Sequence, residues 1–243
     1  MGRVAAVKRE SKAAIFIRDM DPRAMPRYSF GEAGCYLGLP ESTVKSWFVG
    51  MPYGRTPHVK KMEPFLSPAV KDLLSFYDIA SVYVLMALKA KGARSSDLRE
   101  IVTELKKEFP DSRYPLLGRD FALFGKDVVL KKAGRLLNLS KSRQMGLRKV
   151  MDKFLLRIEF DAQLMPLRFS PLRTHRERGK GYIVIDPDFA YGRPIIRGTA
   201  IPAEIVAKRK ESGESEGSLA KDYRISVRAV KEAIKHFPQQ KAA

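Results

Sequence analysis

The chain has 243 residues, which is enough for one large domain or for about two or three small ones. Its hydrophobic content of 44% and aromatic content of 9% are typical of a folded globular protein and exclude disordered and collagen-like classes. The 46 Lys and Arg residues outnumber the 27 Asp and Glu residues, and the net charge is +19. Such an excess, spread along the chain, most often serves to bind nucleic acid. An acidic protein or an acidic membrane surface is the lesser alternative.

The cysteine count and the hydropathy pattern favour a reducing compartment. The single cysteine, Cys35, cannot form an internal disulfide, and residues 1–20 lack the apolar run of a secretory signal. The most apolar stretch, 76–88, contains Asp78 and is shorter than the roughly 20 residues that span a bilayer. We therefore expect a cytoplasmic protein without a membrane span.

The first predicted element after the scattered cations of residues 1–27 is a short capped helix. Ser29, followed three residues later by Glu32, has the spacing of a capping box. The helix is predicted to end at Gly38 and to place Cys35 on its buried side.

A second helix is predicted over residues 41–49. Leu39-Pro40 ends the first helix, because proline cannot continue a helix interior. Val44 and Trp47 lie three residues apart, so they share one face, which we expect to be buried. Glycines and a proline then predict a loop from Gly50 onward.

The middle of the chain is predicted to be mainly helical. Residues 76–91 are apolar almost all round and predict a central helix, and residues 95–109 have the stripe of an amphipathic one. Two short apolar runs, 121–124 and 128–130, predict a hairpin. A further amphipathic helix is predicted to run to Ile158.

The last part of the chain mixes short strands with short helices. Strands are predicted over 182–185 and 195–196, and helices over 202–213 and 216–222. Ser226 is predicted to cap a final helix that ends at Phe237.

These elements predict a mainly α protein. It comprises a winged helix-turn-helix, a helical middle region with small β-hairpins, and a small C-terminal α+β domain ending in a helix-turn-helix-like unit. The predicted domains are a flexible basic extension, the winged module, the middle region, a linker and the C-terminal domain, at 1–27, 28–65, 66–170, 171–181 and 182–243.

The two N-terminal helices have the order of a DNA-reading helix-turn-helix. In this motif the first turn of the second helix enters the major groove, where short polar side chains and backbone N–H groups face the DNA. The predicted DNA-contacting residues here are Glu41, Ser42, Thr43, Lys45 and Ser46. The alternative is a pair of ordinary core helices joined by a tight turn, which the net charge disfavours.

The final helix offers a second surface of the same kind. Ser226, Arg228 and Lys231 are predicted to contact DNA there, and the alternative is that this helix packs in a dimer or against a protein partner. Two such units in one chain suit a homodimer on an inverted repeat.

Signals for an enzyme are weak. His58, His175 and His236 lack the spacing of metal ligands, and neither a phosphate-binding loop nor a dinucleotide-binding motif occurs. No catalytic residue, metal or cofactor is predicted. A basic nuclease and an RNA-binding adaptor remain as alternatives.

One motif set resembles a known family. Tyr28-Ser29-x-x-Glu32-Ala33 and Leu39-Pro40-x-x-Thr43-Val44-Lys45-x-Trp47 are similar to the winged helix-turn-helix of MerR-type regulators, and Leu85-x-x-x-Lys89-x-x-Gly92 with Asp97-Leu98-x-x-Ile101 resembles the helix pair that follows the wing. The resemblance implies that Lys45 binds a phosphate, that Thr43 orients the recognition helix, and that Tyr53 and Arg55 lie on a DNA-contacting wing. No metal-sensing cluster follows, so ligand-induced activation is not implied.

A second motif set resembles a small antitoxin domain that accompanies PIN-type ribonuclease toxins. It comprises Ile185-Asp186-Pro187, Gly192-Arg193-Pro194-Ile195-Ile196-Arg197-Gly198-Thr199-x-Ile201-Pro202 and Asp222-Tyr223. The chain departs from that pattern at Ala200, where a basic residue is usual, and at Tyr191, where glycine is frequent. The order of the two sets is similar to that of Vap-type bacterial antitoxins with a MerR-like module.

This resemblance implies a type II antitoxin that neutralises a PIN-type ribonuclease and represses its own operator. A PIN-type nuclease gathers carboxylates, and a guanidinium pairs with a carboxylate in a fixed fork geometry. The candidate toxin-binding residues are Arg173, Arg176, Arg178, Arg193 and Arg197. For each of them a solvated or phosphate-facing cation is the alternative. The implied partners are operator DNA, the toxin and a second copy of the chain, and the competing function is a MerR-like regulator without a toxin.

Overall fold

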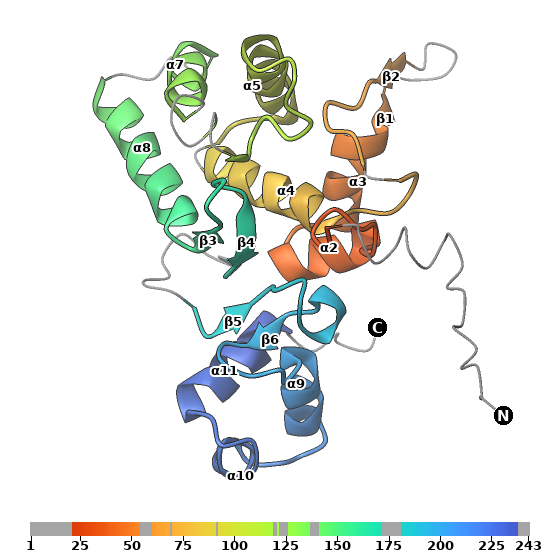
Figure 1. The fold of residues 1–243 in the computed structure, drawn as a ribbon, viewed down its shortest axis with the longest axis vertical. Coiled ribbons are helices and arrows are strands. Elements are labelled where there is room, and N and C mark those ends of the chain that lie inside the picture. The colour runs from red at the N-terminus through yellow and green to blue at the C-terminus, as the bar shows by residue number, and fades with distance from the viewer. Residues whose placement is uncertain are drawn as a thin grey trace, which may run out of the picture.

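A computed structural model gives the fold, and it describes residues 21–53, 60–68, 70–90, 92–118, 121, 126–136, 141–171 and 181–237. Within these ranges the chain is mainly helical, and every β-sheet is a two-stranded antiparallel hairpin. The predicted fold class is confirmed. Figure 1 shows a larger helical body above a smaller C-terminal part. None of the helices in the described ranges has both the length and the apolar character needed to cross a membrane.

The N-terminal elements follow the predicted order. They are α2 (Phe30–Leu37), α3 (Glu41–Val49), β1 (Met51–Tyr53) and β2 (Lys60–Met62). Both hydrogen bonds of the predicted capping box between Ser29 and Glu32 are present, and Gly38 ends α2 with a left-handed φ of 71°. β1 and β2 pair antiparallel directly after α3. The result is a helix-turn-helix followed by a two-stranded wing.

A buried helix organises the middle region. Its elements are α4 (Phe76–Lys89), α5 (Ser95–Glu108), α7 (Lys126–Leu136), α8 (Lys141–Leu155), β3 (Ile158–Phe160) and β4 (Pro166–Phe169). α4 is buried along most of its length, as its composition predicts, and begins with a capping box between Ser75 and Asp78. The Tyr83 ring of α4 stacks on Phe169 with centroids 4.8 Å apart. These contacts pack the β3–β4 hairpin against α4.

Two expectations for the middle region are wrong. Residues 128–130 lie inside α7, and the hairpin of this region is formed by β3 and β4. Val129 and Ala133 are both fully buried at helical spacing. A short apolar run does not distinguish a strand from a buried helix turn, and here the helical period extends beyond the run. Ile158 begins β3, so the preceding helix ends earlier than predicted. Residues 122–125 lie outside the described ranges.

The C-terminal part has its own apolar core. Its elements are β5 (Ile183–Val184), the 3-10 turn η2 (Ala190–Gly192), β6 (Ile195–Ile196), α9 (Ala203–Glu211), α10 (Glu216–Asp222) and α11 (Val227–His236). Val206, Leu219 and Val230 are fully buried at the centre of the three helices. Residues 172–180 lie outside the described ranges, so the linker and the domain boundaries remain predictions.

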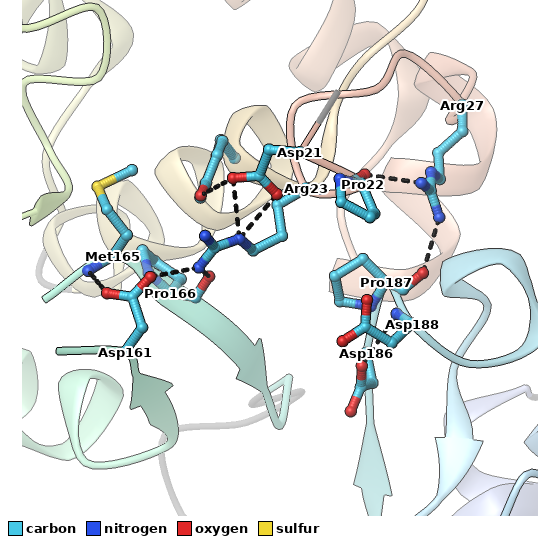
Figure 2. A network of polar contacts seen from close by, with 11 residues as sticks. Asp21, Pro22, Arg23, Arg27, Asp161, Met165, Pro166, Asp186, Pro187 and Asp188 are labelled. Carbon is cyan, nitrogen blue, oxygen red and sulfur yellow. Dashed lines mark hydrogen bonds and ion pairs between the residues drawn. The ribbon is translucent and has the colours of Figure 1, made fainter. Parts of the chain in front are cut away.

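Residues 21–27, the described part of the extension predicted at 1–27, are held to the folded body, and residues 1–20 lie outside the described ranges. Figure 2 shows Arg23 between two carboxylates, and its Nη1 lies 2.6 Å from Oδ2 of Asp161, beside the β3–β4 hairpin. Asp21 accepts hydrogen bonds from Arg23 and from the Tyr77 hydroxyl. Burial alone would raise the pKa of Asp161, but hydrogen bonds from Arg23 and from backbone N–H groups outweigh it, so its pKa lies below the ordinary value.

The next residues connect the winged module to the C-terminal part. Arg27 donates through Nη1 to the Pro187 carbonyl at 2.9 Å, which Figure 2 shows, and the Tyr28 hydroxyl donates to the Gly192 carbonyl at 3.1 Å. Tyr28 also forms an isolated β-bridge with Leu74, just before α4. Its ring is buried, so this junction is a packed contact as well as a polar one.

Candidate nucleic-acid interface

α2 and α3 pack closely because a glycine removes the side chain from their contact. A Cβ on Gly34 would lie 2.7 Å from the Leu39 carbonyl oxygen and 3.3 Å from the Glu41 backbone nitrogen. Within α3, Val44 and Trp47 are fully buried, as predicted. These contacts fix the orientation of α3, so its first turn keeps one face in solvent.

Gly34→Ala is expected to lower the free energy of unfolding by about 1 to 3 kcal/mol, because the new methyl meets backbone atoms of the turn. In a helix interior alanine is more favourable than glycine by about 1 kcal/mol. The expected loss of stability therefore comes from the steric clash, which outweighs this gain. Gly31→Ala in the same helix is the control, since its Cβ meets side-chain atoms of Glu41 and Ser29 and no backbone atom among the nearest three. Urea unfolding of both variants measures the difference, and equal stability would show that the turn has room for a methyl group.

The exposed face of α3 carries most of the predicted DNA contacts. Glu41, Ser42 and Lys45 are exposed, and Thr43 is half-buried. Ser46 corrects the prediction: it is 7% exposed, and its hydroxyl donates to the Thr43 carbonyl at 2.7 Å. A serine inside a helix commonly bonds to a carbonyl one turn earlier, so Ser46 belongs to the internal structure of α3. The accessible surface is therefore the first turn and the face that continues it.

The wing adds cations that the sequence-based prediction missed. In its register Tyr53 is opposite Lys60, and Pro52 is opposite Lys61. Arg55 lies outside the described residues. The pair of adjacent lysines on β2 was visible in the sequence and indicates a basic wing once the hairpin is known.

The C-terminal helices form a second helix-turn-helix-like unit. Ser226 caps α11 by accepting a hydrogen bond from the Ala229 N–H, as predicted. Ser226, Arg228 and Lys231 are all exposed, while the opposite face of α11 is buried against α9 and α10. The Lys231 ammonium lies 3.6 Å from the Glu216 carboxylate, so part of its charge is compensated. Figure 1 shows this unit at the end of the molecule opposite the wing.

The candidate toxin-binding arginines have different environments. Arg197 donates to the Glu159 carboxylate at 2.7 Å, to Ser170 and to the Gly181 carbonyl. These bonds connect β6 to the β3–β4 hairpin and give Arg197 a structural role. Arg193 is exposed, and its Nε donates to the Ala190 carbonyl. The other three candidates lie outside the described residues: Arg173, Arg176 and Arg178.

Glu159 is the centre of the network around Arg197. Its carboxylate also accepts from Arg168, which in turn lies 3.2 Å from Asp186 beyond β5. Burial alone would raise the pKa of Glu159, but hydrogen bonds from the two guanidinium groups lower it below the ordinary value. The carboxylate therefore stays ionised at neutral pH.

Residues with metal or redox chemistry do not gather in the part of the chain that the structure describes. There, no group of three or more His, Cys, Asp or Glu side chains is arranged to hold a metal ion. Cys35 is exposed, which corrects the prediction that it lies on the buried side of α2. His236 is buried in α11, and His58 and His175 lie outside the described residues.

Comparisons with known proteins cover most of the chain. Residues 183–236 match a family described as "Protein of unknown function (DUF433)". The chain is 24% identical over 231 residues to a protein of Mycobacterium tuberculosis named "Putative antitoxin VapB45", covering 86% of this chain and 93% of that protein. The crystal structure of Rv2018 from Mycobacterium tuberculosis matches with a TM-score of 0.61 at 19% identity, over 86% of this chain and 98% of the other. The structural match shows a shared fold.

Proposed function

We propose that the protein is the antitoxin of a type II toxin–antitoxin system, that it neutralises a PIN-type ribonuclease, and that it represses its own operator. The supporting observation is the similarity to the protein named "Putative antitoxin VapB45", which covers 86% of this chain and 93% of that protein. The helix-turn-helix with its wing and the net charge of +19 support the DNA-binding part of the proposal.

In the proposed DNA complex, α3 enters the major groove by its first turn. Glu41 and Ser42 meet base edges, because a carboxylate accepts from the cytosine amino group and a hydroxyl serves several bases. Lys45 binds a phosphate, and Thr43 holds the helix in register. Tyr53 and Arg55 place the wing on the neighbouring backbone. The order of the elements, a helix-turn-helix followed by a two-stranded wing, supports a MerR-like module.

The C-terminal unit supplies a second DNA contact in this proposal. Arg228 and Lys231 face the phosphates from α11, and the Ser226 oxygen is already engaged in capping. A homodimer then presents two equivalent readers to an inverted repeat in the cytoplasm.

Toxin neutralisation is proposed to use the exposed guanidinium of Arg193. It pairs with carboxylates at the metal-binding centre of the toxin, where a fork geometry matches two oxygens. Arg173, Arg176 and Arg178 remain candidates for the same role. Arg197 is not included, because its guanidinium already binds Glu159 and Ser170.

Lys45→Ala is expected to weaken binding to any duplex and to reduce the slope of log K against log salt by about one unit, because one phosphate contact is lost. Arg55→Ala is expected to act in the same way. Fluorescence anisotropy across about 50 to 200 mM salt measures the slope. Lys149→Ala, which removes an exposed lysine from α8, is the control and leaves the slope unchanged. An unchanged slope for Lys45→Ala rejects its placement on a phosphate.

Co-expression with the product of the adjacent reading frame tests the proposal as a whole. The two proteins are expected to purify as a complex, the partner alone to cleave RNA in a metal-dependent way, and the complex to be inactive. Specific binding to the upstream duplex without any complex would instead indicate a MerR-like regulator. Metal-dependent cleavage by this chain alone would indicate a nuclease, and a preference for single-stranded RNA would indicate an adaptor.

A further inference from the structure

The loop between β5 and β6 contains an unusual turn at residues 189–193, which we call the aromatic turn. Ala190, Tyr191 and Gly192 have consecutive left-handed φ values of 47°, 57° and 76°. Alanine and tyrosine reach this region only at a cost in free energy, because their Cβ approaches the backbone carbonyl. The conformation therefore runs against the preference of two of its three residues.

Contacts from inside and outside the turn hold this conformation. The Gly192 N–H donates to the Phe189 carbonyl at 2.8 Å, and the Arg193 N–H donates to the Ala190 carbonyl at 3.2 Å. From the winged module, the Tyr28 hydroxyl donates to the Gly192 carbonyl and packs where a Cβ of Gly192 would stand. The conformation of the turn is thus supported by contacts within this chain.

The side chains that the turn displays contribute little to the core. Tyr191 is 86% exposed and Phe189 is 45% exposed. Arg193 next to them is exposed, and within the described residues no carboxylate pairs with its guanidinium. Tyrosine and arginine, together with tryptophan, are enriched among the few residues that contribute most to binding in protein interfaces. A conformation supported within the chain also reduces the entropy lost on association.

We infer that the aromatic turn is the docking surface for the toxin, with Tyr191 inserted into an apolar pocket next to the toxin carboxylates with which Arg193 pairs. This inference rests on the proposed function. It names an acidic protein as the occupant because the exposed guanidinium and the net charge of +19 both complement an acidic surface. The turn also contacts Tyr28 directly before α2, so the docking surface adjoins the winged module.

Tyr191→Gly separates docking from folding. Glycine adopts a left-handed φ without strain, so the variant is expected to unfold at the same or a higher temperature than the parent. The affinity of the full-length variant for the product of the adjacent reading frame, measured by calorimetry, is expected to fall about 30-fold, as for an interface hot spot. Arg193→Gln is expected to weaken binding about tenfold. Leu156→Ala removes a side chain that is 73% exposed elsewhere and is the control with unchanged affinity.

The outcomes distinguish this inference from the proposed function. If the parent chain does not bind the adjacent product, both are rejected. If the parent binds and Tyr191→Gly binds equally well, only the docking inference is rejected. Sedimentation that shows a dimer for the parent and a monomer for the variant, with toxin affinity unchanged, would make a second copy the occupant. If Tyr191→Gly lowers only the affinity for single-stranded nucleic acid, Tyr191 is instead a stacking platform for bases.

Discussion

Trp47→Ala is expected to lower the free energy of unfolding by about 3 to 5 kcal/mol, the largest loss at any position considered. The indole is fully buried and lies 5.8 Å from the Phe65 ring between centroids. The backbone N–H groups of Phe65 and Leu66 donate to the backbone carbonyl of Trp47. The chain that follows the wing therefore packs over this tryptophan. Far-ultraviolet circular dichroism in urea measures the change, because the variant lacks the only tryptophan.

Two further variants define the origin of this loss. Among the described residues, Nε1 of Trp47 has no hydrogen-bond partner, so the contribution of the indole is packing. Trp47→Phe is therefore expected to lose much less stability than Trp47→Ala. Val49→Ala, at a position 37% exposed in the same helix, is the matched control. If Trp47→Ala unfolds like Val49→Ala, the indole is not part of the core.

Gly192→Ala is expected to lower the free energy of unfolding by about 2 to 4 kcal/mol, from left-handed backbone strain and overpacking together. Gly192 has φ 76°, and its Cβ would collide with the Tyr28 hydroxyl. Part of this loss of stability comes from disrupting the contact between the winged module and the C-terminal part. Urea unfolding followed by the fluorescence of Trp47 reports it from the winged-module side.

Gly198→Ala isolates the backbone contribution to this loss. Gly198 has a similar φ of 79°, but no atom lies within 4 Å of its Cβ position. This variant is expected to lose about 1 to 2 kcal/mol. The excess loss of Gly192→Ala over Gly198→Ala then measures the collision with Tyr28. Equal losses for the two variants would show that the Tyr28 side chain moves away from the new methyl group without lowering the free energy of unfolding.

Local sequence signals predicted the helix starts well. The capping box of Ser29 with Glu32 and the cap that Ser226 provides for α11 are local chemistry, and both are present in the structure. The apolar spacing of Val44 and Trp47 likewise predicted the packed face of α3. Such features depend on residues within one helical turn of each other, so a single sequence suffices to identify them.

Features that depend on distant partners were not predictable in the same way. Residues 128–130 became helical because α7 packs its buried face against α5, which a short apolar run does not reveal. Arg197 and Arg193 look alike in sequence, but only Arg197 meets the Glu159 carboxylate, 38 residues away. The left-handed turn at Ala190 and Tyr191 has no local signal, since neither residue favours that conformation.

Directed cleavage of DNA from the first turn of α3 tests the central claim most directly. In a Cys35→Ser background, Ser42→Cys carries a tethered iron chelate that cuts nearby DNA when reduced. The account predicts cuts within both half-sites of the upstream operator, because the exposed start of α3 enters the major groove. Tight operator binding without any cut from this position would contradict it.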